Sequence, residues 1–242
     1  MPEAQTIRLF VGYDQRAPIL YNVACHSVLR RTRTPVSFTP IHRGALAGAG
    51  IVDRPLLENQ STEFALTRFI VPYLAGYEGW AIFTDNDVIA RDDIAELWGL
   101  RDERYAVQCV QHEHVPANRQ KFLGQQQTTY PKKNWSSVML MNCARCTALT
   151  PQYVASASGL DLHRFNWLDS DDMIGALPPE WNHLVGISAG DLTDQKILHY
   201  TDGGPYYEAT RNCKWADEWL RERDDMLSTA EVSLTDFARR AG

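Results

Sequence analysis

The stretch WAIFTDNDVIARDDIAELW, residues 80–98, decides the architecture that we predict for this chain. Residues 81–84 form a short apolar run that is partly β-branched, as expected of a buried strand. The run ends abruptly at the polar triplet Asp85-Asn86-Asp87, and Asp92-Asp93 then opens a predicted helix, with either aspartate as its N-cap. In open α/β sheets ligands bind outside the carboxyl ends of the strands, which is where this triplet would lie.

Asp85 and Asp87 are candidate metal ligands. Neighbouring carboxylates repel one another and are costly to desolvate unless a cation or hydrogen-bond donors hold them. Mg²⁺ or Mn²⁺ fits this need, because such ions take one or two carboxylates and complete their shell with phosphate oxygens and water. Asp-x-Asp alone is a weak signal and is often only a polar turn. Here the strand before it and the helix after it make a metal site and a polar turn about equally favoured.

Length and composition are those of an ordinary globular protein. The chain has 242 residues, enough to bury a core in one large domain or in one domain with an appended lobe. Its net charge of −6 argues against a nucleic-acid partner, because phosphate contacts come mainly from Lys and Arg. Five scattered cysteines, with a single Cys-x-x-Cys pair at Cys143 and Cys146, favour reduced thiols over a disulfide framework or a zinc site.

The sequence has no apolar run long enough to cross a bilayer, and its first residues lack a signal-peptide pattern. We therefore expect a cytoplasmic protein without a transmembrane segment. Residues 213–242 carry Trp215, Trp219, Leu220 and Phe237 at helical spacing and end with two arginines, which predicts a C-terminal helical cap. Peripheral contact of this segment with the inner face of a membrane is left open.

The first strand is predicted to end at the same mouth of the sheet as the triplet. Residues 7–12 form this apolar strand, a helix follows from Ala17 or Pro18, and residues 36–41 form a second strand. A strand, a crossover helix and a strand are the unit of a parallel sheet. The residues at the end of the first strand, Gly12, Tyr13 and Asp14, would then lie beside Asp85, either as ligand contacts or as an ordinary loop.

His199 ends a further predicted strand, residues 196–200, and is followed by Gly203-Gly204. Paired glycines let backbone N–H groups approach an anion closely. A lone histidine is more often structural. One that stands beside a glycine pair, in a chain that also offers Asp-x-Asp, favours the function of a third metal ligand.

Arg68 lies within residues 62–74, whose apolar side chains recur at helical spacing. It is either a solvated helix arginine or a cation that reaches a diphosphate or the Asp85 triplet. The segment His112-Glu113-His114 follows a predicted strand at 105–111; we favour a polar loop over a metal site there, because no third ligand is near in sequence. The polar residues 118–133 are expected to form a surface loop.

An acidic segment opens a predicted helix over residues 166–177, with aspartates at Asp169, Asp171 and Asp172. The helix dipole favours acids in a first turn and explains one or two of them. The crowding of all three suggests a polar pocket.

Taken together, these motifs resemble the glycosyltransferases of the GT-A fold, nearest to glycosyltransferase family 8, whose members are retaining enzymes that use nucleotide sugars. The matching segments are FALTRFIVP at 64–72, FTDNDV at 83–88, NWSSVMLMN at 134–142, and His199 with Gly203. The chain departs from the family in three places. No lysine follows the glycines at the family's position, so that Arg68, Lys214 or backbone amides must hold the diphosphate; Ser136-Ser137 replaces Ser-Gly; and residues 169–172 match the family's Asp-Gln-Asp only loosely.

The resemblance implies an α/β protein with the GT-A, Rossmann-like architecture: a mostly parallel, twisted sheet flanked by helices over residues 1–210, and the helical cap over 211–242. It implies a metal site for Mn²⁺ or Mg²⁺ at Asp85, Asp87 and His199. The nucleotide sugar would be bound by Gly12, Tyr13, Asp14, Asn86, Gly203 and Gly204. Catalysis would depend on Arg68 and on Asp171 or Asp172.

The function so implied is transfer of a sugar, with retention, from a UDP-sugar to a hydroxyl acceptor such as a glycan or a lipopolysaccharide or capsule precursor. Two other functions stay open. A sugar nucleotidyltransferase usually carries a glycine-rich basic loop after its first strand, which residues 13–18 lack. A non-catalytic nucleotide-sugar-binding protein would use some of the seven tryptophans for stacking on sugars.

Overall fold

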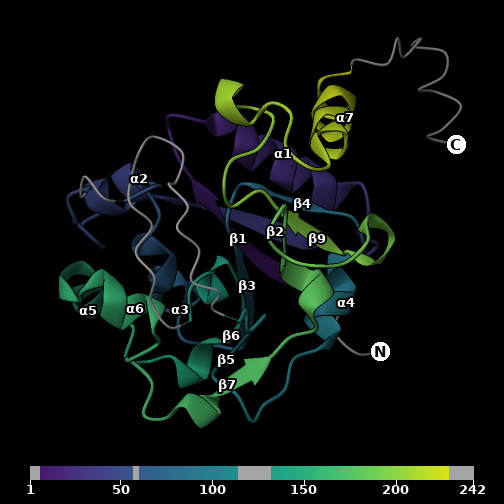
Figure 1. Ribbon diagram of the computed structural model, residues 1–242. Helices are drawn as coiled ribbons and strands as arrows, with labels where there is room; N and C mark the ends of the chain where they lie inside the picture. Colours follow the sequence, from purple (N-terminus) through teal and green to yellow (C-terminus); the bar gives the residue numbers. More distant parts are fainter. Residues whose placement is uncertain (1–5, 57–59, 114–131, 229–242) are drawn as a thin grey trace, which may run out of the picture.

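A computed structural model of the chain describes residues 6–56, 60–113 and 132–228. It has a central six-stranded sheet with helices on both faces (Figure 1). The strand order is β2-β1-β3-β6-β5-β7. The strands are β1 (Ile7–Tyr13), β2 (Val36–His42), β3 (Trp80–Thr84), β5 (Val107–Cys109), β6 (Val138–Asn142) and β7 (Ile174–Ala176).

The sheet is mostly parallel. β1 pairs in parallel with β2 and β3, and β5 pairs in parallel with β7. β6 alone runs in the opposite direction, between β3 and β5. The carboxyl ends of β1, β3, β5 and β7 therefore lie along one edge of the sheet, together with the amino end of β6. The sequence predicted this for β1 and β3.

A second, three-stranded sheet has the order β4-β9-β8. Its strands are β4 (Val88–Ala90), β8 (His183–Leu184) and β9 (Ile197–His199). β4 follows β3 after only three residues, and it pairs antiparallel with β9 so that Val88 lies opposite His199. This pairing brings two segments more than a hundred residues apart to the end of β3.

Helices cover the two faces of the central sheet, and neighbouring residues of a strand point to opposite faces. Ile82 packs in one apolar core beside α1 (Pro18–Leu29) and α4 (Ile94–Gly99), while Ala81 and Phe83 pack in the other. The second core lies beside the remaining short helices: α2 (Arg43–Gly48), α3 (Val71–Leu74), α5 (Pro151–Ser156) and α6 (Gly159–His163). The α4 N-cap is Asp93, whose side chain accepts a hydrogen bond from the amide of Ala95, as one of the two predicted alternatives.

Of two predicted helices, the one at residues 62–74 forms only in its second half, and the one at 166–177 is wrong. Residues 62–74 form turns, then the 3₁₀ helix η1 (Thr67–Ile70), then the single turn α3, where Pro72 is tolerated because it lies in the first turn. Residues 166–177 form the 3₁₀ helix η5 (Asp171–Met173) and then β7. Gly175 makes room for the ring of Tyr105 within β7, and pairing with β5 outweighs the local helical pattern.

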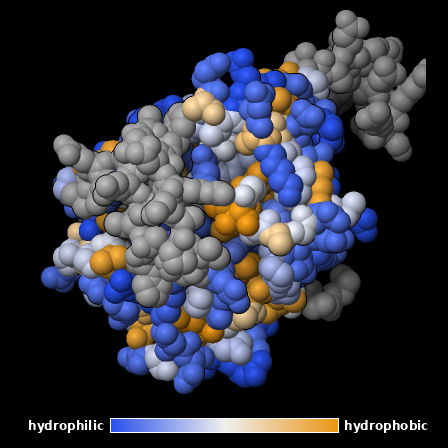
Figure 2. All heavy atoms as spheres, viewed as in Figure 1, coloured by the Kyte–Doolittle hydropathy of each residue, from blue (hydrophilic) through white to orange (hydrophobic). Residues whose placement is uncertain are grey.

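The helix α7 (Ala216–Leu227) packs against α1, with Trp219 buried, and forms the C-terminal helical element that the sequence predicts (Figure 1). The end of this segment, residues 229–242, and residues 114–131 of the polar loop lie outside the described residues. Whether a domain boundary lies near residue 210 stays a prediction. In the described part of the chain, no helix is both long and apolar enough to span a membrane. The face in Figure 2 is mainly hydrophilic, with apolar side chains in small groups.

Candidate metal centre

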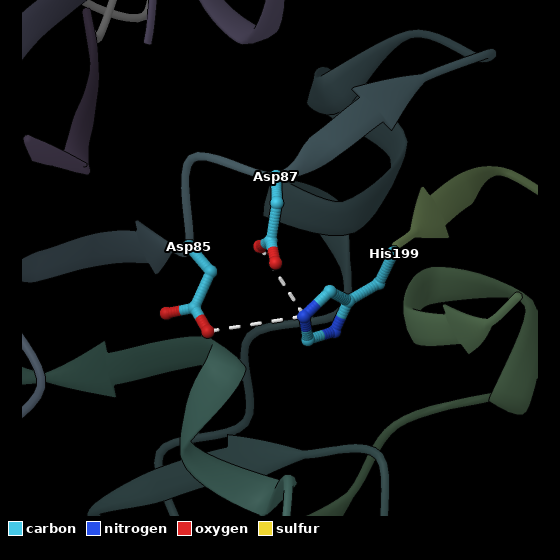
Figure 3. Close-up of side chains that lie close together, drawn as sticks. All are labelled: Asp85, Asp87 and His199. Carbon is cyan, nitrogen blue, oxygen red and sulfur yellow. Dashed lines mark ion pairs between the residues drawn. The ribbon is translucent and has the colours of Figure 1, made fainter. Parts of the chain in front are cut away.

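Asp85, Asp87 and His199 lie together at the end of β3 (Figure 3). Asp85 follows β3 directly, Asp87 precedes β4, and His199 ends β9, opposite Val88. The Nε2 atom of His199 is 3.3 Å from Oδ1 of Asp87 and 3.9 Å from Oδ2 of Asp85. One ligand atom from each of the three residues lies within 4.8 Å of the other two. The sequence predicted this convergence, and the structure has it.

These three residues fit a divalent cation. The Oδ1 atom of Asp87 is buried, and the Nε2 atom of His199 lies 3.3 Å from it. A buried carboxylate oxygen without a committed donor is costly unless a cation balances it. Carboxylates suit Mg²⁺ and Mn²⁺, and neutral imidazole is a common metal ligand. The identity of the ion is not determined by this donor set.

The pKa shifts of Asp87 and His199 also indicate that the cluster favours a positive charge. Burial raises the pKa of Asp87, but the charge and hydrogen bond of His199 outweigh burial and leave it below its ordinary value. Burial lowers the pKa of His199, but Asp87 and Asp85 outweigh burial and raise it. Without an ion, a proton on His199 supplies part of the charge that the two carboxylates require.

Arg68 is buried and belongs to the same cluster. Its Nη1 atom lies 2.7 Å from Oδ1 of Asp85 and donates to the carbonyl oxygen of Ser136 at 3.0 Å. The guanidinium lies over the rings of Phe64 and Phe83, at 5.4 and 5.2 Å from their centroids. The interpretation of Arg68 as a solvated arginine is therefore wrong. The structure instead agrees with the alternative, in which Arg68 contacts the Asp85 triplet.

The residues after β1 contact one another more than the cluster. Asp14 is buried and accepts hydrogen bonds from Arg16 and from the amide of Glu63. Burial raises the pKa of Asp14, but its hydrogen bonds with Arg16 and Glu63 outweigh burial and leave this pKa below its ordinary value. Tyr13 makes edge-to-face contacts with the rings of Tyr21 and His42. A nucleotide-binding role for Gly12, Tyr13 and Asp14 stays a prediction.

The glycine pair after β9 forms a tight turn. The Gly203 amide donates to the carbonyl oxygen of Tyr200 at 2.8 Å, so it is engaged in the turn rather than directed at an anion, contrary to the prediction for this amide. Gly203 has φ +100°, a conformation that favours glycine. A Cβ on Gly204 would lie 2.4 Å from the ring of Tyr206. The role of Gly204 in diphosphate binding stays a prediction.

This turn carries Tyr206 and Tyr207 to the cluster, which the sequence reasoning missed. Burial raises the pKa of Tyr206, and the charge of Asp87 adds to that rise. Burial also raises the pKa of Tyr207, followed by the charges of Asp14 and Asp87. Tyr207 is thus within electrostatic reach of both Asp14 and Asp87. The Tyr206-Tyr207 pair behind two glycines is the only sequence signal for this placement.

Among curated proteins, the chain is 42% identical to Protein CDI of Arabidopsis thaliana over 229 residues, which are 92% of this chain and 88% of that protein. The chain belongs to the family of Protein CDI. No protein-family model matches the chain.

Solved structures similar in fold include glycosyltransferases of the GT-A class, and this member of the Protein CDI family has the GT-A fold. The glycosyltransferase GlyE of Streptococcus pneumoniae matches 98% of the chain with a TM-score of 0.61 and 14% identity. The galactosyltransferase LgtC, solved with donor and acceptor sugar analogues, matches 93% of the chain and 98% of its own length with a TM-score of 0.58 and 14% identity. The chain spans 64% of GlyE and 52% of the bifunctional WbbM.

Asp171 and Asp172 lie elsewhere in this Protein CDI relative. Both belong to η5, which lies at the amino end of the edge strand β7. Asp85 instead lies at the carboxyl end of β3, and β3 and β7 run in the same direction. Asp171 pairs with Lys132, and its side chain is 75% exposed. Asp172 forms hydrogen bonds with Ser170. The structure does not bring these acids to the carboxyl end of β3, and their catalytic role stays a prediction.

Other predicted residues have mixed placements. Asn86 is buried beside the cluster, with its Nδ2 atom unpaired among the described residues, so a ligand contact stays a prediction. The Lys214 ammonium lies over the Trp215 ring at 4.1 Å. His112 forms a hydrogen bond with Asn182, and residue 114 lies outside the described residues, so the preference for a polar loop over a metal site there stays a prediction. Cys143 and Cys146 are buried free thiols, as expected.

Proposed function

We propose that this protein is a metal-dependent glycosyltransferase that moves a sugar from a nucleotide diphosphate sugar to a hydroxyl acceptor. One observation carries the proposal. Two carboxylates, an imidazole and a buried guanidinium converge at the carboxyl end of a central strand of a GT-A sheet. In open α/β sheets this edge is where ligands bind.

Asp85, Asp87 and His199 would hold Mn²⁺ or Mg²⁺ at this edge. Such an ion supplies positive charge where negative charge develops on the departing diphosphate. Arg68 holds Asp85 in place through its contact with Oδ1, and its own position is set by the carbonyl oxygens of Ala65 and Ser136.

The finer assignment follows the resemblance to glycosyltransferase family 8. The donor is a UDP-sugar, the product retains the anomeric configuration, and the acceptor is a glycan or a lipopolysaccharide or capsule precursor. The sugar passes through an oxocarbenium-like state, as in other glycosyl chemistry. In a retaining reaction of this kind the departing phosphate accepts the acceptor's proton, so no separate base is required. Asp171 or Asp172 would line the sugar only if η5 approached the cluster.

The test is a panel of nucleotide sugars, each incubated with the protein and Mn²⁺. Hydrolysis or transfer, together with a thermal shift, identifies the donor. We expect a UDP-sugar to give both signals and excess chelator to abolish turnover. Release of pyrophosphate from a sugar phosphate and a nucleoside triphosphate would instead identify a nucleotidyltransferase, and a thermal shift without turnover would identify a binding protein.

Asp87→Ala is expected to abolish metal-dependent donor turnover while the fold survives, because it removes a ligand but leaves the apolar cores intact. Circular dichroism and a donor assay measure the two properties. Asp92→Asn is the control, since Asp92 lies five residues further on and pairs with Lys196 at 3.2 Å instead. Full transfer activity in Asp87→Ala, or in excess chelator, would contradict the metal role.

A further inference from the structure

Behind His199 lies a buried amide, Asn182, that closes a hydrogen-bond network. Asn182 is fully buried at the end of the 3₁₀ helix η6 (Pro179–Asn182), just before β8. Its Oδ1 atom lies 3.0 Å from Nδ1 of His199, on the side of the ring away from the carboxylates. Its Nδ2 atom lies 2.9 Å from Oγ of Ser137, 3.0 Å from Nε2 of His112 and 3.3 Å from the carbonyl oxygen of Asn134.

Hydrogen-bond chemistry alone determines which way the Asn182 amide points. The Ser137 hydroxyl lies 2.6 Å from the carbonyl oxygen of Asn134 and must donate to it, because a carbonyl oxygen only accepts. The Ser137 oxygen can then only accept from Asn182. Of the three neighbours on this side of the amide, the Ser137 oxygen and the Asn134 carbonyl oxygen can only accept. The atom of Asn182 that faces them is therefore the nitrogen, and the oxygen faces His199.

The orientation of the amide determines the tautomer of His199. Oδ1 of Asn182 accepts only, so Nδ1 of His199 must carry a proton. In the neutral ring the lone pair is then on Nε2, the atom that faces Asp85 and Asp87. That is the form that binds a metal through Nε2, and in metal sites the second ring nitrogen usually donates to such a partner.

We propose that Asn182 is a positioning residue that holds His199 in the Nδ1–H tautomer, with its Nε2 lone pair directed at the candidate metal centre. The proposal rests on the proposed function for its metal, but not for the tautomer itself. The network joins four segments: the end of β5 through His112, the start of β6 through Asn134 and Ser137, η6, and β9. The imidazole is therefore preset before any ion arrives.

The tautomer is tested without metal, by two-bond ¹⁵N–¹H correlation spectra of histidine-labelled protein in chelator, at a pH where the ring of His199 is neutral. The signal that disappears in His199→Gln identifies the residue. We expect protonated Nδ1 in the wild-type chain. Asn182→Ala should show the Nε2–H form, which can donate to Asp87. A wild-type ring protonated on Nε2 would overturn the proposal without any variant.

Mn²⁺ binding, measured by calorimetry and electron paramagnetic resonance, tests the consequence. Loss of such an outer partner typically weakens metal binding about 10–100-fold, which we expect for Asn182→Ala, with loss of nitrogen coupling to Mn²⁺. The matched control is Asn142→Ala, because Asn142 is also a buried asparagine but pairs with Glu103 at the other end of β6.

The outcomes separate the two proposals. Wild-type Kd and unchanged nitrogen coupling in Asn182→Ala would overturn the positioning role and leave the proposed function standing. Absence of Mn²⁺ binding by the wild-type chain would overturn the metal role in the proposed function. The chelator spectra would still decide whether Asn182 holds the tautomer.

Discussion

Charge balance at four side chains explains most of the chemistry of this site. Asp85 and Asp87 bring two negative charges into a largely buried space, and Arg68 neutralises one of them through a contact of 2.7 Å. Neutral His199 leaves the second charge uncompensated. A proton on His199 or a divalent cation can balance this charge. A bound ion leaves His199 neutral, which is the form whose Nε2 lone pair faces the carboxylates.

Arg68→Met is predicted to lower the free energy of unfolding by about 3–5 kcal/mol, the usual cost of removing one partner of a buried pair. Asp85 would lose its counter-charge, and Ser136 would lose the donor to its carbonyl oxygen. Urea denaturation in chelator measures the change. Arg104→Met is the control: this arginine is 75% exposed beside Asp102, and its loss should change the stability little. Equal effects of the two substitutions would refute the buried-charge argument.

His112 should make the fold sensitive to acid. Burial, followed by the charges of His199 and His183, lowers the pKa of His112 from its ordinary 6.5 to about 4. Between these two values the unfolded chain binds a proton that the folded chain does not, so stability falls as pH falls from about 6.5 towards 4. Urea denaturation at pH 7 and at about pH 5, in chelator, should show a smaller loss for His112→Gln than for wild type. Parallel losses would show that another group causes the sensitivity.

At the scale of elements, the register of two short strands decides whether a metal centre exists. β4 is only three residues long, and its pairing with β9 places Val88 opposite His199. The Tyr200 amide extends the pairing by donating to the carbonyl oxygen of Asp87 at 2.9 Å. A slip of one residue would turn the imidazole to the opposite face of this sheet, away from both carboxylates. The site therefore depends on backbone pairing as much as on its side chains.

β1 ends where its backbone must approach a buried ring. A Cβ on Gly12 would lie 2.3 Å from Phe64, whose side chain is fully buried and cannot move aside cheaply. Gly12→Ala is predicted to cost about 1–3 kcal/mol by overpacking, and to disturb Arg68, which lies over the same ring. Gly48→Ala is the control, because a Cβ there meets nothing within 4 Å. Thermal unfolding compares the two, and a neutral Gly12→Ala would contradict the packing argument.

At the scale of the whole molecule, one buried carboxylate joins the C-terminal helix to the rest of the chain. Glu222 on α7 is 3% exposed, lies 2.7 Å from Nδ1 of His26 and 2.9 Å from Arg31, and faces α1. Trp219, one turn earlier, is buried in the same interface. The helical cap is thus held by packing and by charge together.

Glu222→Gln is predicted to lower the free energy of unfolding by about 1.5–3 kcal/mol, the range for hydrogen bonds to charged groups. Because Glu222 faces α1 rather than the metal centre, donor turnover should stay near wild type at low temperature. Asp225→Asn is the control, since Asp225 is 45% exposed and its pair with Arg30 should contribute at most about 1 kcal/mol. A loss of turnover without a loss of stability would mean that α7 takes part in the site.

Some of the fold and of the site could be read from local pattern. The apolar run at 81–84, the carboxylates after it and the histidine before two glycines all carry their signal within a few neighbouring residues. Residues 166–177 misled the same reasoning, because their apolar spacing is helical while their pairing partner, β5, is more than sixty residues away. Asn182 gave no signal, since an asparagine between Trp181 and His183 looks like many others.

The sequence by itself determined which residues end the strands at the ligand edge of the sheet, and so which side chains could form the metal centre. Tertiary structure alone decided that Arg68 is buried against Asp85, that β4 and β9 bring His199 to the carboxylates, and that Asn182 holds its ring. The physical reason is range. Strand and turn preferences act between neighbours along the chain, whereas burial, ion pairing and the proton position on an imidazole depend on groups that only the folded chain brings within a few ångströms.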